Sequence, residues 1–321
     1  MNKYNKKLII LSILTLICSL AYLFYDLNLD FFKFSMSLRV PKLLAMLLTA
    51  YCIGAASLIF QTIIRNTIVT PCLLGMNSLY LLIHTGVMFF FGSASVLVLN
   101  KYVSFGVDLI LMGTIATFVY SYLFRVTKYN VLYVLLAGTV MATFFSSLQN
   151  SMVRIMDPNE YDALLSSLVA SFNSVNADIL AIAIIITIVL SLIYYKDLAV
   201  LDVLSLGKEN AINLGIDYDK TIKRLLLGVT LFIAVATALV GPISFLGLII
   251  ANLSRELFKT YRHNYLVAGS VLMGMLVLVA GQVIVERVFI LSIPISVFIS
   301  IAGGLYFMYL LILNRGKLWK Y

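Results

Sequence analysis

Residues 178–195 read DILAIAIIITIVLSLIYY, and this stretch decides the fold class. Its only charged residue is Asp178, at the first position, and the charged pair Lys196 and Asp197 follows it directly. A helix needs about 20 mostly apolar residues to cross the hydrocarbon core of a bilayer. The stretch therefore predicts a transmembrane helix.

The same pattern recurs along the whole chain. Further apolar windows lie at 8–24, 43–60, 72–91, 103–124, 131–153, 222–240, 243–258, 264–282 and 293–313. Of the 321 residues, 62% are hydrophobic and only 12% are charged. Soluble domains have about 25% charged residues. No linker or low-complexity tract divides the chain. We therefore expect an all-α, polytopic membrane protein of about ten transmembrane helices, with residues 1–321 forming a single domain.

The distribution of basic residues predicts the topology. With the N-terminus in the cytoplasm and ten alternating spans, 17 of the 23 Lys and Arg residues lie inside and 6 lie outside. Basic residues favour the cytoplasmic side, so we expect both termini to be cytoplasmic. The window 8–24 is interpreted as a retained first helix, because no small-residue cleavage site follows it. No basic cluster on a soluble module indicates nucleic-acid binding.

Motifs for enzymatic chemistry are missing from the sequence. There is no Gly-x-x-x-x-Gly-Lys-Ser/Thr phosphate loop, no His-Glu-x-x-His pair and no Gly-x-Ser-x-Gly elbow. His84 and His263 have no partner at metal-ligand spacing and are interpreted as packing or interfacial residues. Cys18, Cys52 and Cys72 lie in or beside apolar runs and form no CxxC motif. We expect no catalytic residue, metal or cofactor, although an intramembrane hydrolase stays open as an alternative.

Acidic residues near the membrane bear on how transport would be energised. Ion-coupled carriers usually place charged side chains deep in their helices. Asp108, Asp178 and Glu286 all lie toward outer helix ends in the predicted topology. This favours a permease whose energy comes from another subunit, with an ion-coupled secondary carrier as the alternative.

The longest hydrophilic stretch, from Lys196 to Arg224, is cytoplasmic in this topology. Within it, residues 201–216 predict a short amphipathic helix with Val203, Leu204, Leu206, Ala211 and Leu214 on one side. Gly215 is a plausible helix stop, because glycine adopts the left-handed conformation that ends helices. Such a helix could lie on the membrane surface or dock into a partner.

At this stretch the chain resembles the FecCD family of ABC-transporter permeases, which import iron–siderophore complexes, haem and cobalamin. The family pattern Leu-x-x-Leu-x-Leu-Gly-x-x-x-Ala-x-x-Leu-Gly matches residues 201–215. Segments 39–42, 54–75 and 241–248 resemble three further family motifs in the same order. The resemblance implies that the stretch docks on an ATPase subunit. The residues expected to couple to the ATPase are Leu204, Leu206, Gly207, Glu209, Ala211, Leu214 and Gly215.

The resemblance also implies an assembly. A type II ABC importer permease has ten helices and lies in the bacterial cytoplasmic membrane. It pairs with a second permease copy or a paralogue, and the pair works with two ATPases and an extracytoplasmic substrate-binding protein. The family's arginines that meet the binding protein match Arg39, Lys42 and Arg287 here. Anchoring of Arg39 and Lys42 at lipid headgroups is the alternative.

Polar groups near the second and third spans are candidates for the translocation path. They are Gln61, Asn66, Asn77 and Ser78. Interhelical hydrogen bonding is an equally common role for such side chains in membranes. The small residues Gly54, Ala55, Ala56 and Ser57 are expected to allow close approach of helices.

Overall fold

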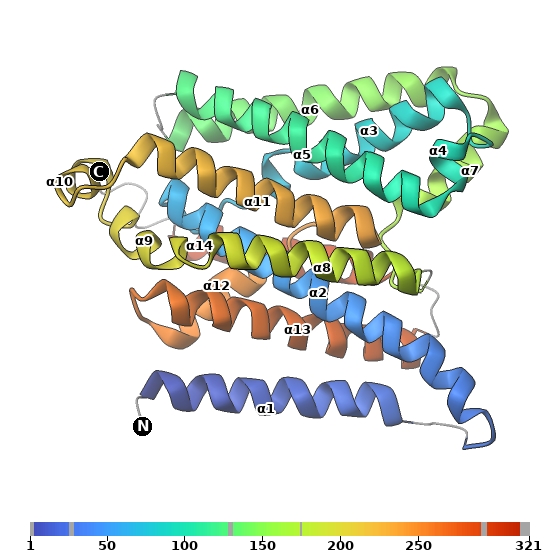
Figure 1. The fold of residues 1–321 in the computed structure, drawn as a ribbon, viewed down its shortest axis with the longest axis horizontal. Helices are drawn as coiled ribbons and strands as arrows, with labels where there is room; N and C mark the ends of the chain where they lie inside the picture. The colour runs from blue at the N-terminus through green and yellow to red at the C-terminus, as the bar shows by residue number, and fades with distance from the viewer. Residues whose placement is uncertain (1–2, 26–28, 128–130, 174, 290–293, 315–321) are drawn as a thin grey trace.

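The computed structural model describes residues 3–25, 29–127, 131–173, 175–289 and 294–314 (Figure 1). Over these residues the chain is helical and contains no β-strand. Each of the ten predicted windows coincides with a helix, which confirms the all-α polytopic fold class. The ten are α1 (Lys3–Phe24), α2 (Phe32–Ile64), α3 (Met76–Phe91), α5 (Lys101–Val126), α6 (Val131–Ile155), α8 (Ala177–Tyr194), α11 (Tyr218–Val240), α12 (Leu246–Phe258), α13 (His263–Arg287) and α14 (Ile295–Asn314).

Length and composition agree with a membrane environment. In the part of the chain that the structure describes, α1, α2, α5, α8, α11 and α13 are long and apolar enough to cross a bilayer. Helix α2 lies at the centre and packs against α11 and α13. Large apolar side chains stay exposed on the peripheral helices, including Phe118 on α5, Ile185 on α8 and Ile301 on α14. Soluble monomers rarely expose apolar surface of this extent to water, whereas contact with lipid accommodates it.

Two boundaries differ from the expected windows. Helix α2 begins at Phe32 and runs for 33 residues, so segment 39–42 lies inside it, with Pro41 in the helix interior. Helix α12 has only 13 residues. It starts after Phe245, which has a left-handed backbone with φ 61°. About 20 Å of helix is too short to cross the hydrocarbon core, and the non-helical lead-in 241–245 precedes it.

Short elements occupy the loops. They are η1 (Leu29–Phe31), η2 (Cys72–Leu74), α4 (Val96–Leu99), α7 (Pro158–Leu168), α9 (Asp197–Leu204) and α10 (Lys208–Asn213). Helix α7 lies in the stretch between the windows 131–153 and 178–195. The carboxylate of Asp157 caps this helix by accepting from the Asn159 N–H, and Pro158 occupies its first turn.

Small residues let helices approach α2 closely, as predicted. A Cβ on Gly54 would lie 3.2 Å from the backbone of Ser270 and Val271 on α13. Three residues further along α2, a Cβ on Gly247 of α12 would overlap the Ser57 hydroxyl. Helices α12 and α13 are thus both packed closely against the C-terminal half of α2.

Candidate functional site

The stretch 201–216 forms two short helices rather than one. Helix α9 ends at Leu204, and α10 starts at Lys208. Between them Gly207 has φ 100° and ψ 168°, a conformation that is essentially restricted to glycine. Gly215, with φ 83°, follows the end of α10, so the predicted helix stop is confirmed. The expectation of one continuous helix was wrong, because Gly207 reverses the backbone in the middle of it.

Apolar residues of the stretch divide between two sides. Leu201, Leu204 and Ala211 are buried and anchor the stretch on the bundle. By contrast, Leu206, Ile212 and Leu214 are more than half exposed, and Glu209 is exposed as well. The prediction that Leu204, Leu206, Ala211 and Leu214 share one side was therefore wrong. The break at Gly207 turns one set inward and leaves the other for a partner.

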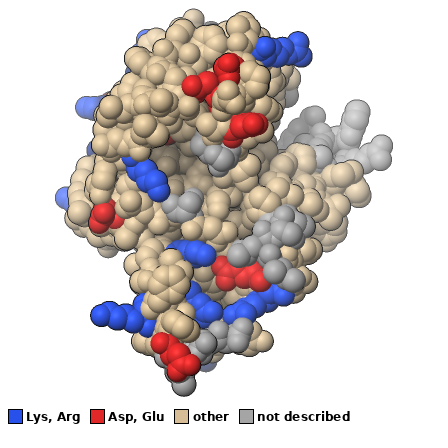
Figure 2. All heavy atoms as spheres, turned by 90° about the vertical axis from the view of Figure 1, so that its right-hand side faces the viewer, with Lys and Arg blue, Asp and Glu red and all other residues tan. Residues whose placement is uncertain are grey.

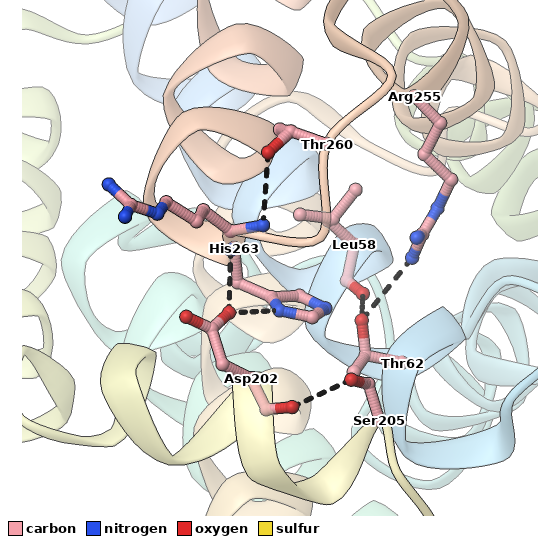
Figure 3. A network of polar contacts seen from close by, with 8 residues as sticks. Leu58, Thr62, Asp202, Ser205, Arg255, Thr260 and His263 are labelled. Carbon is pink, nitrogen blue, oxygen red and sulfur yellow. Dashed lines mark hydrogen bonds and ion pairs between the residues drawn. The ribbon is translucent and has the colours of Figure 1, made fainter.

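Ion pairs and hydrogen bonds hold the stretch to neighbouring helices. The guanidinium of Arg224 on α11 donates to both carboxylate oxygens of Asp197 on α9, with 3.0 Å between Nε and Oδ2. The Lys208 ammonium on α10 lies 3.1 Å from the Asp219 carboxylate. Asp202 on α9 contacts His263 at the start of α13, with 2.6 Å between Oδ1 and Nδ1 (Figure 3). The base of the stretch is thus firmly positioned, while α10 presents an apolar surface.

Two of the predicted path residues lie at the C-terminal end of α2. Gln61 is 1% exposed and accepts from the Arg255 Nε at 3.3 Å, while its amide donates to the Thr67 carbonyl. The Asn66 side chain accepts from the Ile68 N–H and closes a turn. Gln61 thus makes an interhelical hydrogen bond, which was the alternative role, while the Asn66 side chain makes a local one.

The other two predicted path residues lie at the start of α3. The Asn77 amide donates to the Ser244 hydroxyl at 3.0 Å, and the Ser78 hydroxyl accepts from Ser146 on α6 at 3.1 Å. Asn77 Oδ1 is buried and has no hydrogen-bond partner among the described residues. The structure therefore separates the four residues into a pair at the C-terminal end of α2 and a pair that joins α3 to α6 and to the α12 lead-in.

A polar stripe on α6 was missed in the sequence. Thr139, Thr143, Ser147, Asn150 and Arg154 are all exposed in this chain and recur at spacings of three or four residues. That spacing places them on one face of the helix. The signal was present in the window 131–153, but apolar length alone was considered there. An exposed polar stripe on a membrane helix is suited to a water-filled path or a polar interface rather than to lipid.

The three predicted outer residues line one hollow of about 290 Å³. It lies at the end of the molecule shown in Figure 2, where Lys and Arg side chains gather in the lower part of the view. Arg39 donates to the carbonyls of Leu23 and Tyr25 at 2.9 Å. Lys42 donates to the Asn173 side chain at 3.0 Å. The Arg287 guanidinium lies 5.0 Å from the centre of the Tyr25 ring, so cations of α2 and α13 form a single surface.

The histidines were interpreted as packing or interfacial residues, and in the structure both are buried and each has an aspartate partner. His263 contacts Asp202, and His84 on α3 contacts Asp108 on α5, with 3.1 Å between Nδ1 and Oδ2. The second pair is buried, and Tyr80 stacks on the His84 ring. Among the described residues, no group of three or more His, Cys, Asp and Glu side chains could hold a metal ion.

Comparison with known proteins assigns the family. A model of the FecCD transport family matches residues 7–313. The chain belongs to the FecCD transport family. It is 45% identical to the petrobactin import system permease protein YclO of Bacillus subtilis over 98% of each chain. It is 28% identical to the Fe(3+) dicitrate transport system permease protein FecD of Escherichia coli, over 87% of this chain and 85% of that protein.

A solved structure has the same fold. An inward-facing metal-chelate type ABC transporter chain superposes with a TM-score of 0.82 at 23% identity, covering 97% of this chain and 99% of that chain. Since FecCD proteins are permeases of ABC importers, the chain is a multi-pass membrane transport subunit and not an enzyme, and ATP hydrolysis belongs to a separate subunit. The comparisons do not favour the ion-coupled carrier.

Proposed function

We propose that the chain is the permease subunit of an ATP-driven importer of a ferric siderophore, with petrobactin as the first cargo to test. Two petrobactin import permeases support this cargo, YclO at 45% identity and FatC of Bacillus anthracis at 30%. One structural observation carries the mechanism. The exposed apolar residues Leu206, Ile212 and Leu214 lie on or beside α10, above a base that is held by ion pairs to α11 and by the Asp202–His263 contact to α13.

The proposed orientation follows from this surface. Helices α9 and α10 lie at the end of the molecule where α1 begins (Figure 1), and an ATPase is available only in the cytoplasm. Both termini are then cytoplasmic, and the hollow of Arg39, Lys42 and Arg287 faces the binding protein. The functional unit contains two permeases, identical or paralogous, and two ATPases. Closure of the ATPases pushes on α10 and drives alternating access.

The docking surface on α10 is tested by introducing charge. Leu206→Glu and Leu214→Glu should each lower retention of the ATPase at least about tenfold, because burying a leucine contributes roughly 1.5–3 kcal/mol. The measurement is a pull-down of the partner ATPase from detergent-solubilised membranes. Tyr261→Glu is the matched control, since Tyr261 is another exposed apolar side chain, 72% exposed, in the loop between α12 and α13. If both leucine variants retain the ATPase as the native chain does, α10 is not the docking surface.

The stripe on α6 is proposed to line the path. Thr143→Trp should abolish most siderophore uptake, because the indole projects from the middle of the stripe into the space that the cargo needs. Uptake of ⁵⁵Fe-labelled siderophore by cells that express each variant is the measurement. Ile185→Trp is the control, because Ile185 is 62% exposed on the apolar face of α8. Equal uptake by the two variants would show that this face of α6 is not in the path.

The outer hollow is proposed to meet acidic residues on the binding protein. Arg287→Glu should weaken its association roughly two- to fivefold at low salt, with a smaller effect at high salt, because exposed ion pairs contribute at most about 1 kcal/mol and are screened. Lys101→Glu is the control, since it changes a basic residue at the exposed start of α5, outside the hollow. Surface plasmon resonance on reconstituted permease measures both. Losses of the same size in the two variants would indicate a general charge effect.

A further inference from the structure

Helix α13 begins without a cap from its own sequence. Its first residue is His263, and the preceding Arg262 makes no side-chain capping hydrogen bond. The first four N–H groups of a helix have no acceptor within the helix. Here the carboxylate of Asp202, which belongs to α9, accepts from the His263 N–H at 2.8 Å. A residue of the stretch 201–216 therefore caps α13, although it belongs to a different helix.

The same carboxylate oxygen also binds the imidazole. Asp202 Oδ1 lies 2.6 Å from His263 Nδ1, as Figure 3 shows. The His263 side chain is only 3% exposed, and that of Asp202 is 36% exposed. An anion at a helix N-terminus is stabilised by the helix dipole. Two hydrogen bonds and this field act on a single oxygen, so α9 cannot shift along α13 without breaking them.

On the α9 side, the backbone that carries the Asp202 carboxylate is held in place. Leu201 and Leu204 flank Asp202 and are at most 2% exposed. The Ser205 hydroxyl donates to the Asp202 carbonyl at 2.7 Å. Helix α9 is therefore a short, well-anchored element between the turn at Gly207 and the start of α13.

On the α13 side the contacts continue into the bundle. The Ser254 hydroxyl of α12 donates to the Leu266 carbonyl at 2.7 Å, and the Ser270 hydroxyl donates to the Gly54 carbonyl of α2 at 3.1 Å. Arg255 of α12 reaches Thr62 of α2 at 3.2 Å. A displacement of the first turn of α13 is thus passed to α12 and α2, which pack on it along their lengths.

We propose that Asp202 and His263 form the link that carries a displacement of α9 and α10 into α13, and through α13 into α2 and α12. The inference rests on the proposed function, because the displacement comes from the partner ATPase. Both are positioning residues, and neither contacts cargo or nucleotide. Removal of the link leaves ATPase docking and hydrolysis intact and lowers the amount of siderophore moved for each ATP hydrolysed.

A purely static cap is the competing explanation, and the chain offers a matched control for it. Asp217 caps α11 within its own sequence, accepting from the Lys220 N–H at 3.2 Å. Like Asp202 it is an aspartate that caps a helix at the same end of the bundle, although it is more exposed than Asp202, and its contact joins no second element. A static role predicts the same behaviour for Asp202→Ala and Asp217→Ala. The proposed link predicts that only Asp202→Ala alters coupling.

The experiment uses the complete transporter in proteoliposomes, with its ATPase, its binding protein and ferric petrobactin. Iron uptake and phosphate release are measured together, and thermal unfolding reports stability. For Asp202→Ala the iron moved per ATP should fall at least about tenfold, because one charge-assisted hydrogen bond already accounts for a factor of that size and the variant loses two. Asp217→Ala should keep the native ratio. Adding His263→Gln to Asp202→Ala should cause little further loss, because residues that act as a unit are not additive.

A second variant covers the case in which Asp202→Ala does not assemble. Asp202→Asn keeps an oxygen for the His263 N–H but loses the charge, so it should fold and show an intermediate ratio. A native ratio in the assembled Asp202 variants, or an equal fall in Asp217→Ala, would overturn the link. Native transporter that takes up iron without ATP dependence would instead refute the proposed function, and the link with it, before any variant is compared.

Discussion

Replacing Gly207 with valine is expected to lower ATP-driven uptake roughly 100-fold while leaving the protein in the membrane. Gly207 has φ 100° and ψ 168°, and forcing a residue with a side chain into such a conformation costs about 1–3 kcal/mol. A Cβ there would also lie 3.0 Å from the Arg65 guanidinium at the end of α2. The turn between α9 and α10 must then rearrange, and α10 loses its position relative to the bundle.

The measurement combines three readouts in reconstituted transporter: membrane level, ATP hydrolysis and uptake. Gly207→Val should keep the first, retain hydrolysis by the ATPases, and lose the third. Glu209→Lys, which reverses an exposed charge on α10, should act in the same direction with a smaller effect. Gly106→Val is the control, because a Cβ at that helical glycine of α5 meets nothing within 4 Å. Normal uptake in Gly207→Val would remove the turn from the coupling mechanism.

The membrane helices were predictable because their signal is local. An apolar run of sufficient length must cross the bilayer or be buried, whichever helices surround it. The boundaries of α2 and α12 were not predictable in the same way. Residues 32–42 are polar enough to read as a loop, yet they continue α2 for three turns. At the other boundary, α12 starts only after Phe245, whose backbone is left-handed. Counting apolar residues in a window does not predict that conformation.

The coupling stretch shows where local pattern stops being sufficient. Its leucines and glycines identified the segment, and Gly215 ends the helix as expected. The orientation of each side chain depended instead on the backbone of Gly207. A count of helical spacing assumes a continuous helix, so it assigned Leu204 and Leu214 to one side although the first is buried and the second is 62% exposed.

Contacts between residues far apart in the chain could not be predicted from the sequence. Asp202 and His263 are 61 residues apart, and His84 and Asp108 are 24 apart. With a single sequence, each histidine had no visible partner. The outer cations were identified by family resemblance, but their common hollow depends on how α2 and α13 pack. The stripe on α6 is the exception, since its spacing alone could have revealed it.

The largest expected effect on stability concerns His84 and Asp108. Asp108→Ala should destabilise the protein by roughly 3 kcal/mol, because it leaves a buried imidazole without its partner. His84 Nε2 already has no hydrogen-bond partner among the described residues, so the lost contact with Asp108 has no substitute on the ring. The thermal unfolding of detergent-solubilised permease measures the effect, and Asp178→Ala is the control, since that aspartate is exposed at the start of α8.

The double variant decides what the pair does. Replacing both residues with leucine removes both polar groups together, and such replacement of a buried pair is often neutral. If the pair only joins α3 to α5, the double variant should regain stability and transport at the native rate. Recovered stability with lost transport would instead give the pair a role in the transport cycle. Such a role is physically reasonable because α3, which carries His84, packs against α6, which carries the polar stripe. A stable Asp108→Ala would contradict both, because the imidazole would then have found another partner or water.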